Sequence, residues 1–349
     1  MSADTGVAQE RSLGIPGRLA NWNVAIIAVT VVVLIVAAAT VQNFATSQNF
    51  GFLVLDLLPI ALVALPMTLV IVTGEIDLSV ASTLGLSSAV MGYLWNANQP
   101  IETIIPLCLL LGAVLGAVNG FFVTVLGLPS LAVTIGTLAL YRGLAFVVLG
   151  DGAVADFPAV YTDWVTGTIA GTSIPNVLII IVVLAAVFGV ILHATPIGRA
   201  VFAVGASDQA ARFAGVRPGR LKFWLYVVSG LVAGLAGVLW TLRYSSARAD
   251  NGAGLELAVV AAVLLGGVSI FGGKGALPGV IAGVVLLASL QNALRLSDVS
   301  NEALNVVTGV LLIVSVLAPN LANAVRSSVQ RRRHRSDPLQ GHRPERAQP

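Results

Sequence analysis

Long apolar runs recur along almost the whole chain and constrain its fold more than any other feature. Ten segments approach the roughly 20 apolar residues that cross about 30 Å of hydrocarbon. Hydrophobic residues make up 57% of the 349 residues, and charged residues only 10%, against about 25% in ordinary soluble domains. The short alternating segments of a transmembrane barrel do not appear. The chain is therefore predicted to be an all-α polytopic membrane protein with about ten transmembrane helices.

Short polar segments separate the expected spans. The first span has an alternative interpretation as a cleaved signal peptide, because Ala37-Ala38-Ala39 resembles a small-residue cleavage site. The long polar lead before it favours an uncleaved helix. The expected spans cover residues 24–41, 51–72, 80–95, 104–126, 131–149, 176–193, 223–240, 255–271, 276–296 and 304–319.

The basic residues predict how the chain is oriented. With ten spans and a cytoplasmic N-terminus, 15 of the 19 Lys and Arg residues fall in cytoplasmic segments, as the positive-inside rule requires. The chain then divides into a cytoplasmic segment 1–23, a transmembrane domain 24–320 and a basic cytoplasmic tail 321–349. Each half also has an Asn followed 17 residues later by a Gly (Asn119 and Gly136, Asn292 and Gly309), which is compatible with an inverted repeat of two five-helix halves.

Residues 194–222 form a polar, basic interruption between two apolar spans. Ser207 is suited to cap a helix start, Gly215 is suited to a helix end, and Phe213 between them offers an apolar side chain. We expect a short helix outside the membrane on the cytoplasmic face, with an ordinary amphipathic connector lying on the membrane as the alternative. The charged residues of this segment are Arg199, Asp208, Arg212, Arg217, Arg220 and Lys222.

A second polar break, residues 74–79, lies between two apolar runs and carries Glu75, Asp77 and Ser79. A charge at mid-bilayer costs roughly 2.5–3.5 kcal/mol, so such residues usually face protein or water. Glu75 and Asp77 are two positions apart and need not form a paired acid site, and Asp77 or Ser79 could cap the following span. The break is either a structural hairpin or a gate in a translocation path.

Three further polar residues lie inside apolar runs. Arg142 is expected to form a structural ion pair, with Asp56, Glu75 or Asp77 as candidate partners. Asn119 and Asn292 are expected to bond between helices rather than to bind a solute.

Four segments together carry a resemblance to a known family. They are residues 67–80, 138–143, 205–216 and 266–275, and they occur in the family's order. The chain resembles the permeases of ABC importers for ribose, xylose and arabinose over about residues 50–320. It departs from the usual pattern at Glu75 and Ala81, where Gly is commoner, and at Ser207, where Asn is commoner. The departures at Glu75 and Ala81 suggest a subgroup, with the rhamnose and autoinducer-2 transporters as candidates, whereas Ser207 keeps a helix-capping side chain.

The resemblance implies a permease subunit of the bacterial inner (plasma) membrane. It implies a second permease subunit, either identical or related, two ATPase subunits and a periplasmic or lipoprotein sugar-binding protein. It implies no cofactor in this chain, because the partner ATPase binds ATP and Mg. The implied ATPase-coupling residues are Gly205, Ser207, Asp208, Ala210, Ala211, Arg212, Phe213 and Gly215. The candidate translocation or gate residues are Glu75, Asp77, Ser79, Asn119, Arg142 and Asn292.

The sequence carries no recognisable catalytic motif. Lys274 is followed by Gly275 and lacks the pattern of a phosphate-binding loop, and no Cys/His cluster has metal-ligand spacing. We therefore expect no enzyme activity and no metal site. Anchoring at an anionic leaflet explains the basic run 331–335 better than nucleic-acid binding does. The alternatives are an ion-driven secondary transporter that uses Glu75 or Asp77, and a membrane scaffold without transport.

Overall fold

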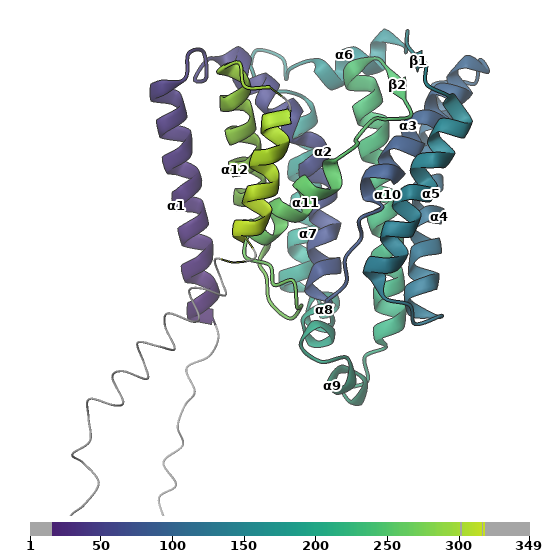
Figure 1. Ribbon diagram of the computed structural model, residues 1–349, viewed down its shortest axis with the longest axis vertical. Coiled ribbons are helices and arrows are strands. Elements are labelled where there is room, and N and C mark those ends of the chain that lie inside the picture. The colour runs from purple at the N-terminus through teal and green to yellow at the C-terminus, as the bar shows by residue number, and fades with distance from the viewer. Residues whose placement is uncertain (1–15, 301, 316, 318–349) are drawn as a thin grey trace, which may run out of the picture.

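The computed structural model describes residues 16–300, 302–315 and 317, which form thirteen helices and one pair of two-residue strands (Figure 1). The expectation of an all-α membrane protein is confirmed. The helices are α1 Pro16–Thr40, α2 Ser47–Val72, α3 Val80–Asn96, α4 Ile101–Thr124, α5 Ser130–Leu149, α6 Ala159–Thr166, α7 Val177–Ala194, α8 Pro196–Ala206, α9 Asp208–Phe213, α10 Pro218–Tyr244, α11 Leu255–Leu265, α12 Leu277–Leu296 and the unlabelled Glu302–Ser315; the strands are β1 Ala153–Val154 and β2 Ala247–Arg248.

Seven of the described helices, rather than ten, are long and apolar enough to cross a membrane: α1, α2, α4, α5, α7, α10 and α12. The expected span 255–271 is wrong in length, because α11 has only 11 residues and reaches about 16 Å at 1.5 Å per residue. It ends where Gly266 and Gly267 follow, the latter at φ +88°. The span 80–95 is the 17-residue α3, and the span 304–319 lies partly outside the described residues.

Helix α2 is the centre of the bundle. Its apolar window is 94% buried, and the helix contacts α7, α10, α11 and α12. Pro59 and Pro66 both lie inside it, as packed membrane helices tolerate. In Figure 1, α3, α4, α5 and α10 lie to the right of α2, while α1 and α12 lie to the left. In the polar break that follows α2, Asp77 and Ser79 are buried among these helices, each being 1% exposed.

Glycines bring α10 unusually close to α4. A Cβ added at Gly112 would collide with the carbonyl group of Gly230, and one added at Gly116 would collide with that of Tyr226. Gly237 likewise meets the carbonyl oxygen of Leu84 on α3. Small residues of α10 thus permit the close approach of the neighbouring helices.

Different short elements lie at the two ends of the bundle (Figure 1). The α9 end carries α8 and α9, and the strand end carries α6, β1 and β2. The two strands pair antiparallel, with Ala153 opposite Arg248 and Val154 opposite Ala247. The loops 150–175 and 241–254, which the predicted orientation places on one side of the membrane, thus meet at the strand end.

The arginines at the strand end have acidic partners. Asp56 of α2 pairs with Arg243 of α10 and, at 2.9 Å, with Arg295 of α12. Arg248 pairs with Asp250 at 2.8 Å, and its hydrogen bonds lower the pKa of the Asp250 carboxyl. Four basic residues lie outside the cytoplasmic segments, and one of them, Arg142, is inside a span. The other three, Arg243, Arg248 and Arg295, each have a neutralising carboxylate nearby.

Helices α2 and α10 run in opposite directions, since α10 follows α9 and leads to β2 (Figure 1). Each is followed by an irregular segment and then by a short buried helix, α3 or α11. This arrangement is compatible with an inverted repeat, which remains a prediction. The matched Asn–Gly spacing adds no support, because neither Gly136 nor Gly309 has a neighbour within 4 Å of an added Cβ.

Candidate coupling site

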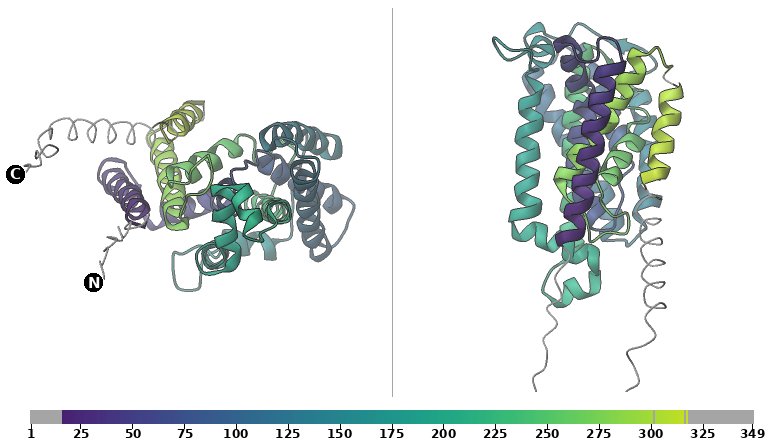
Figure 2. Two further views of the ribbon diagram at one scale, coloured as in Figure 1. Left: turned by 90° about the horizontal axis from the view of Figure 1, so that it is seen from below. Right: turned by 90° about the vertical axis from the view of Figure 1, so that its left-hand side faces the viewer.

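The basic segment 194–222 folds as two helices rather than the single one expected. Helix α8 begins at Pro196, and the side chain of Thr195 caps it by accepting a hydrogen bond from the Gly198 amide at 3.4 Å. Helix α9 follows after a bend at Ser207. Helix α10 begins at Pro218, five residues earlier than the expected start at 223. Figure 2, right, shows α8 and α9 extending below the neighbouring helices.

Helix α9 is closed at both ends by its own sequence. The Ser207 hydroxyl accepts a hydrogen bond from the Ala210 amide at 3.2 Å, as predicted for a helix cap. At the other end Gly215 has φ +83°, and the amides of Gly215 and Val216 donate to the carbonyl groups of Arg212 and Ala211, both at 3.0 Å. This is the Schellman arrangement, and the predicted cap at Gly215 is confirmed.

Phe213, the last residue of α9, points outward. Its side chain is 85% exposed, although burying a phenyl ring contributes about 1.5–3 kcal/mol. The rigid short helix therefore presents an apolar side chain at the tip of the α9 end. Ala211, by contrast, is 2% exposed and faces the protein. An exposed ring on a capped helix is suited to insertion into a partner's groove.

A glycine junction joins α8 to the interior of the bundle. A Cβ added at Gly205 would collide with the Val72 carbonyl oxygen and with the Gly273 amide nitrogen. That amide donates to the same Val72 oxygen at 2.8 Å, and Gly272 and Gly273 have φ +80° and +71°. The end of α8, the end of α2 and the segment after α11 thus meet in one backbone contact. Sequence reasoning identified these glycines as parts of motifs but not as one junction.

Lys222 joins α9 to the break after α2. Its ammonium nitrogen lies 2.8 Å from Oε1 of Glu75 and 3.1 Å from Oδ2 of Asp208. The Lys222 and Glu75 side chains are 12% and 17% exposed, and that of Asp208 is 45% exposed. Sequence analysis counted Lys222 only as one basic residue of the interruption. No local signal indicates a partner 147 positions away.

Asp77 faces a different set of groups from Glu75. One carboxyl oxygen accepts from the amide and the hydroxyl of Ser79, at 3.1 and 2.7 Å, and the other accepts from the Ser229 hydroxyl at 3.1 Å. Glu75 and Asp77, which the sequence does not require to form a paired acid site, have separate partners. Of the two residues expected to cap α3, Ser79 makes no side-chain cap bond. Asp77 instead accepts the amide of Ser79 itself.

Asn119 extends this buried polar cluster to α4. Its amide donates to the Ser79 hydroxyl at 2.7 Å, and the Tyr141 hydroxyl of α5 lies 3.5 Å from its carbonyl oxygen. Asn292 lies elsewhere and exchanges two hydrogen bonds with Asn49 of α2, at 2.9 and 3.1 Å. Both asparagines bond between helices, as expected. The gate candidates therefore do not converge on one place.

The expected ion pair of Arg142 is wrong. Its guanidinium donates to the carbonyl groups of Ala249 at 2.6 Å, Asn251 at 2.9 Å and Ala81 at 3.2 Å. Each of the three proposed acids has other partners. Backbone carbonyls are among the groups that satisfy charged side chains inside a bundle of membrane helices. Gly85 makes room, because a Cβ there would collide with the guanidinium.

The described residues thus form a bundle of apolar helices that carries a short, capped helix at one end, connected by Lys222 to the break after α2. A protein family described as "Branched-chain amino acid transport system / permease component" matches residues 49–316. The chain belongs to this family of permease components, as the resemblance to ABC importer permeases implied. It is therefore a transport subunit and not itself an enzyme.

Individual relatives cover nearly the whole chain. The chain is 33% identical over 324 residues to the "Autoinducer 2 import system permease protein LsrD" of Yersinia pseudotuberculosis serotype O:1b (strain IP 31758), covering 90% of this chain and 97% of that protein. It is 32% identical, with the same coverage, to the protein of that name in Yersinia pestis (strain Pestoides F). No solved structure shows a significant match.

Proposed function

We propose that this chain forms the translocation pathway of an ATP-driven importer for a monosaccharide-type solute, and that α8 and α9 contact a separate ATPase subunit. Autoinducer 2 is the first candidate solute, because the relatives are named for its import. The observation that carries the proposal is that the segment formed by α8 and α9 is connected to the bundle at two places. Lys222 joins α9 to the break after α2, and Gly205 joins α8 to the end of α2.

These two connections suggest how force passes into the membrane. When two ATPase subunits close on ATP, they move the helix that carries Phe213. Because α9 is capped at both ends, it moves as a rigid unit. The motion passes through Lys222 to the break after α2, and through the glycine junction to the segment after α11. The pathway then alternates between inward-facing and outward-facing states. ATP on the ATPase subunits and solute on the binding protein shift the balance between these states.

The proposed assembly has further parts. A second permease subunit, identical or related, completes the pathway in the bacterial inner membrane, and a periplasmic or lipoprotein binding protein delivers solute to the strand end. The N-terminus, the C-terminus and α9 then face the cytoplasm. The partner ATPase binds ATP and Mg.

An ion-driven secondary transporter is the alternative function. It needs a carboxyl group free to bind a proton or cation. Glu75 pairs with Lys222, and Asp77 accepts hydrogen bonds from Ser79 and Ser229. Each acid already has partners of its own, which favours the coupled permease.

Uptake in vesicles tests the proposal. The protein is reconstituted with its candidate ATPase and binding protein, and wild type is compared with Asp208→Arg/Phe213→Ala. Val182→Ala is the control, because Val182 is 57% exposed in the middle of α7, away from both ends of the bundle. We expect uptake that needs ATP, collapses in the double variant and persists in the control. Uptake without ATPase that an uncoupler or Glu75→Gln abolishes would overturn the proposal.

A further inference from the structure

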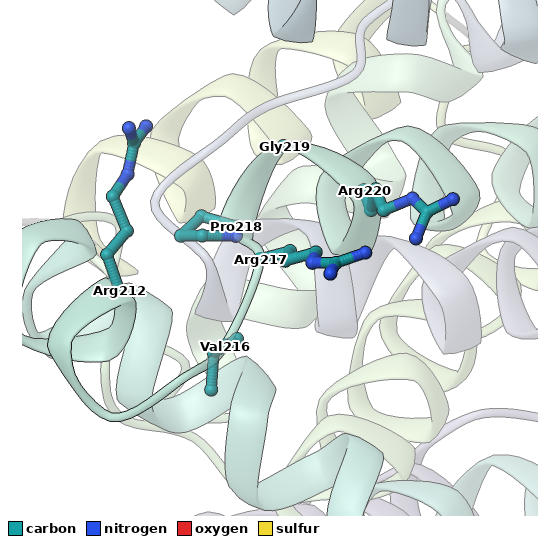
Figure 3. A pocket seen from close by; sticks show the side chains of 6 residues that line it. All are labelled: Arg212, Val216, Arg217, Pro218, Gly219 and Arg220. Atoms are coloured by element: carbon teal, nitrogen blue, oxygen red, sulfur yellow. The ribbon is translucent and has the colours of Figure 1, made fainter.

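A shallow, open pocket with three arginines lies where α9 connects to α10 (Figure 3). The Arg217 and Arg220 side chains extend to the same side in this view, while Arg212 rises on the other side of Pro218. All three arginines are exposed. The lining residues are Arg212, Val216, Arg217, Pro218, Gly219 and Arg220.

No carboxylate among the described residues pairs with these arginines. The five ion pairs of the described chain involve Lys222, Arg243, Arg248 and Arg295 as the cations. The one acid of this segment, Asp208, is used by Lys222. At the strand end, by contrast, Arg243, Arg248 and Arg295 each have a carboxylate partner.

Exposed apolar side chains lie next to the pocket, and they favour an anion that also carries an apolar part. The end of α4 lies against it, since a Cβ at Gly219 would lie 3.8 Å from the Thr124 carbonyl oxygen. The next residues, Val125 and Leu126, are 65% and 53% exposed, and Leu128 is 44% exposed. Trp224, one turn beyond Arg220 on α10, is 61% exposed. Exposed apolar residues with a Trp beside basic residues are typical of the boundary between acyl chains and headgroups.

We propose that Arg217 and Arg220 bind the phosphate group of an anionic phospholipid from the leaflet at the α9 end. Guanidinium groups bind phosphate oxygens with paired, charge-assisted hydrogen bonds. The acyl chains of the same lipid would cover the exposed residues at the end of α4. Such a lipid would fix the start of α10 next to the moving α9. This inference concerns the membrane alone and does not depend on the transported solute.

Lipid binding to the purified protein tests this proposal. The protein in detergent is titrated with phosphatidylglycerol or phosphatidylcholine, and bound lipid is measured by native mass spectrometry. We expect wild type to prefer phosphatidylglycerol. Arg217→Gln/Arg220→Gln should weaken that binding roughly fivefold for each charge removed. Arg217→Lys/Arg220→Lys should retain an intermediate affinity, because it keeps the charge but loses the paired geometry.

A matched control separates a site from general attraction. Arg199→Gln/Lys274→Gln also removes two exposed charges from the α9 end, outside the pocket, and should leave the affinity near that of wild type. Equal weakening by the two Gln pairs, or no lipid preference in wild type, would overturn the proposal. Unchanged lipid binding together with lost ATPase binding would also overturn it and assign the pocket to carboxylates of that partner.

Discussion

Lys222 places one ammonium group between two carboxylates that belong to different parts of the fold. Glu75 lies in the break after α2, and Asp208 opens α9. With Lys222 and Glu75 only 12% and 17% exposed, removal of one partner leaves the other poorly solvated. The pair is therefore expected to hold the break and α9 in a fixed relation.

Replacement of Lys222 tests that relation. Lys222→Met should lower the free energy of unfolding by about 1–3 kcal/mol, because Glu75 loses its donor, and should lower ATP-dependent uptake. Glu75→Gln/Lys222→Met should be closer to wild type than Lys222→Met, since the unpaired charge is then removed as well. Unfolding midpoints of the four proteins in a double-mutant cycle give the coupling between the two residues. Strictly additive effects would show that the ion pair contributes nothing.

Local signals explain which parts of the site the sequence could predict. The apolar runs, the Ser207 cap and the Gly215 end depend on residues a few positions apart, and the structure confirms them. Glu75, the partner of Lys222 in the break after α2, is 147 positions away, and the carbonyl partners of Arg142 are more than 60 positions away. Residue type alone favours acids for both basic residues. Two of the carbonyls that bind Arg142, those of Ala249 and Asn251, lie in the irregular segment after β2, and the third, that of Ala81, lies in the first turn of α3. No pattern in the sequence shows that these carbonyls face Arg142.

At the scale of elements, α9 is the shortest helix of the described chain, and it is the helix that the proposed function uses most. Six residues are too few for a stable isolated helix in water. Its stability must come from the two caps and from its contacts with neighbouring elements. The caps therefore control whether Phe213 is presented on a rigid or a frayed segment.

The Ser207 cap can be changed without touching the bundle. Ser207→Ala should cost about 1 kcal/mol of local helix stability, and Ser207→Asn should cost little because Asn also caps. The measurement is hydrogen exchange of the amides in 208–213, with ATP-dependent uptake in parallel. Faster exchange and lower uptake are expected for Ser207→Ala only. Lower uptake without faster exchange would contradict a role through helix rigidity.

The length of α11 shows where element prediction fails. The apolar run to Phe271 suggests a full span, but the helix ends at Leu265. Gly266 meets the backbone of Gly279 and Val280 on α12. The turn that ends α11 thus depends on packing against a helix that follows it in the chain. A glycine pair in an apolar run does not by itself reveal such a contact.

At the scale of the whole molecule, Asp56 connects three helices at the strand end. Its carboxylate, on α2, pairs with Arg243 of α10 and with Arg295 of α12. Asp56→Asn should lower the free energy of unfolding by about 1–3 kcal/mol, because the Arg243 side chain is only 11% exposed. Arg295→Gln should cost only about 0–1 kcal/mol, because Arg295 is 53% exposed. Denaturant unfolding in the same detergent measures both. A larger loss for Arg295→Gln would show that the exposed pair is the main tie.

The glycine junction at the other end tests whether the molecule transmits motion along the proposed path. Gly205→Ala places a methyl group where the Val72 carbonyl oxygen and the Gly273 amide now lie, so α8 must move away from α2. Helix α9 keeps the caps at both of its ends, so Phe213 is still presented in the same way. ATPase binding should therefore persist while solute uptake falls. Gly143→Ala is the matched control, because a Cβ there has no neighbour within 4 Å. If Gly205→Ala transports as well as the control, α8 does not drive α2, and Lys222 must carry the motion alone.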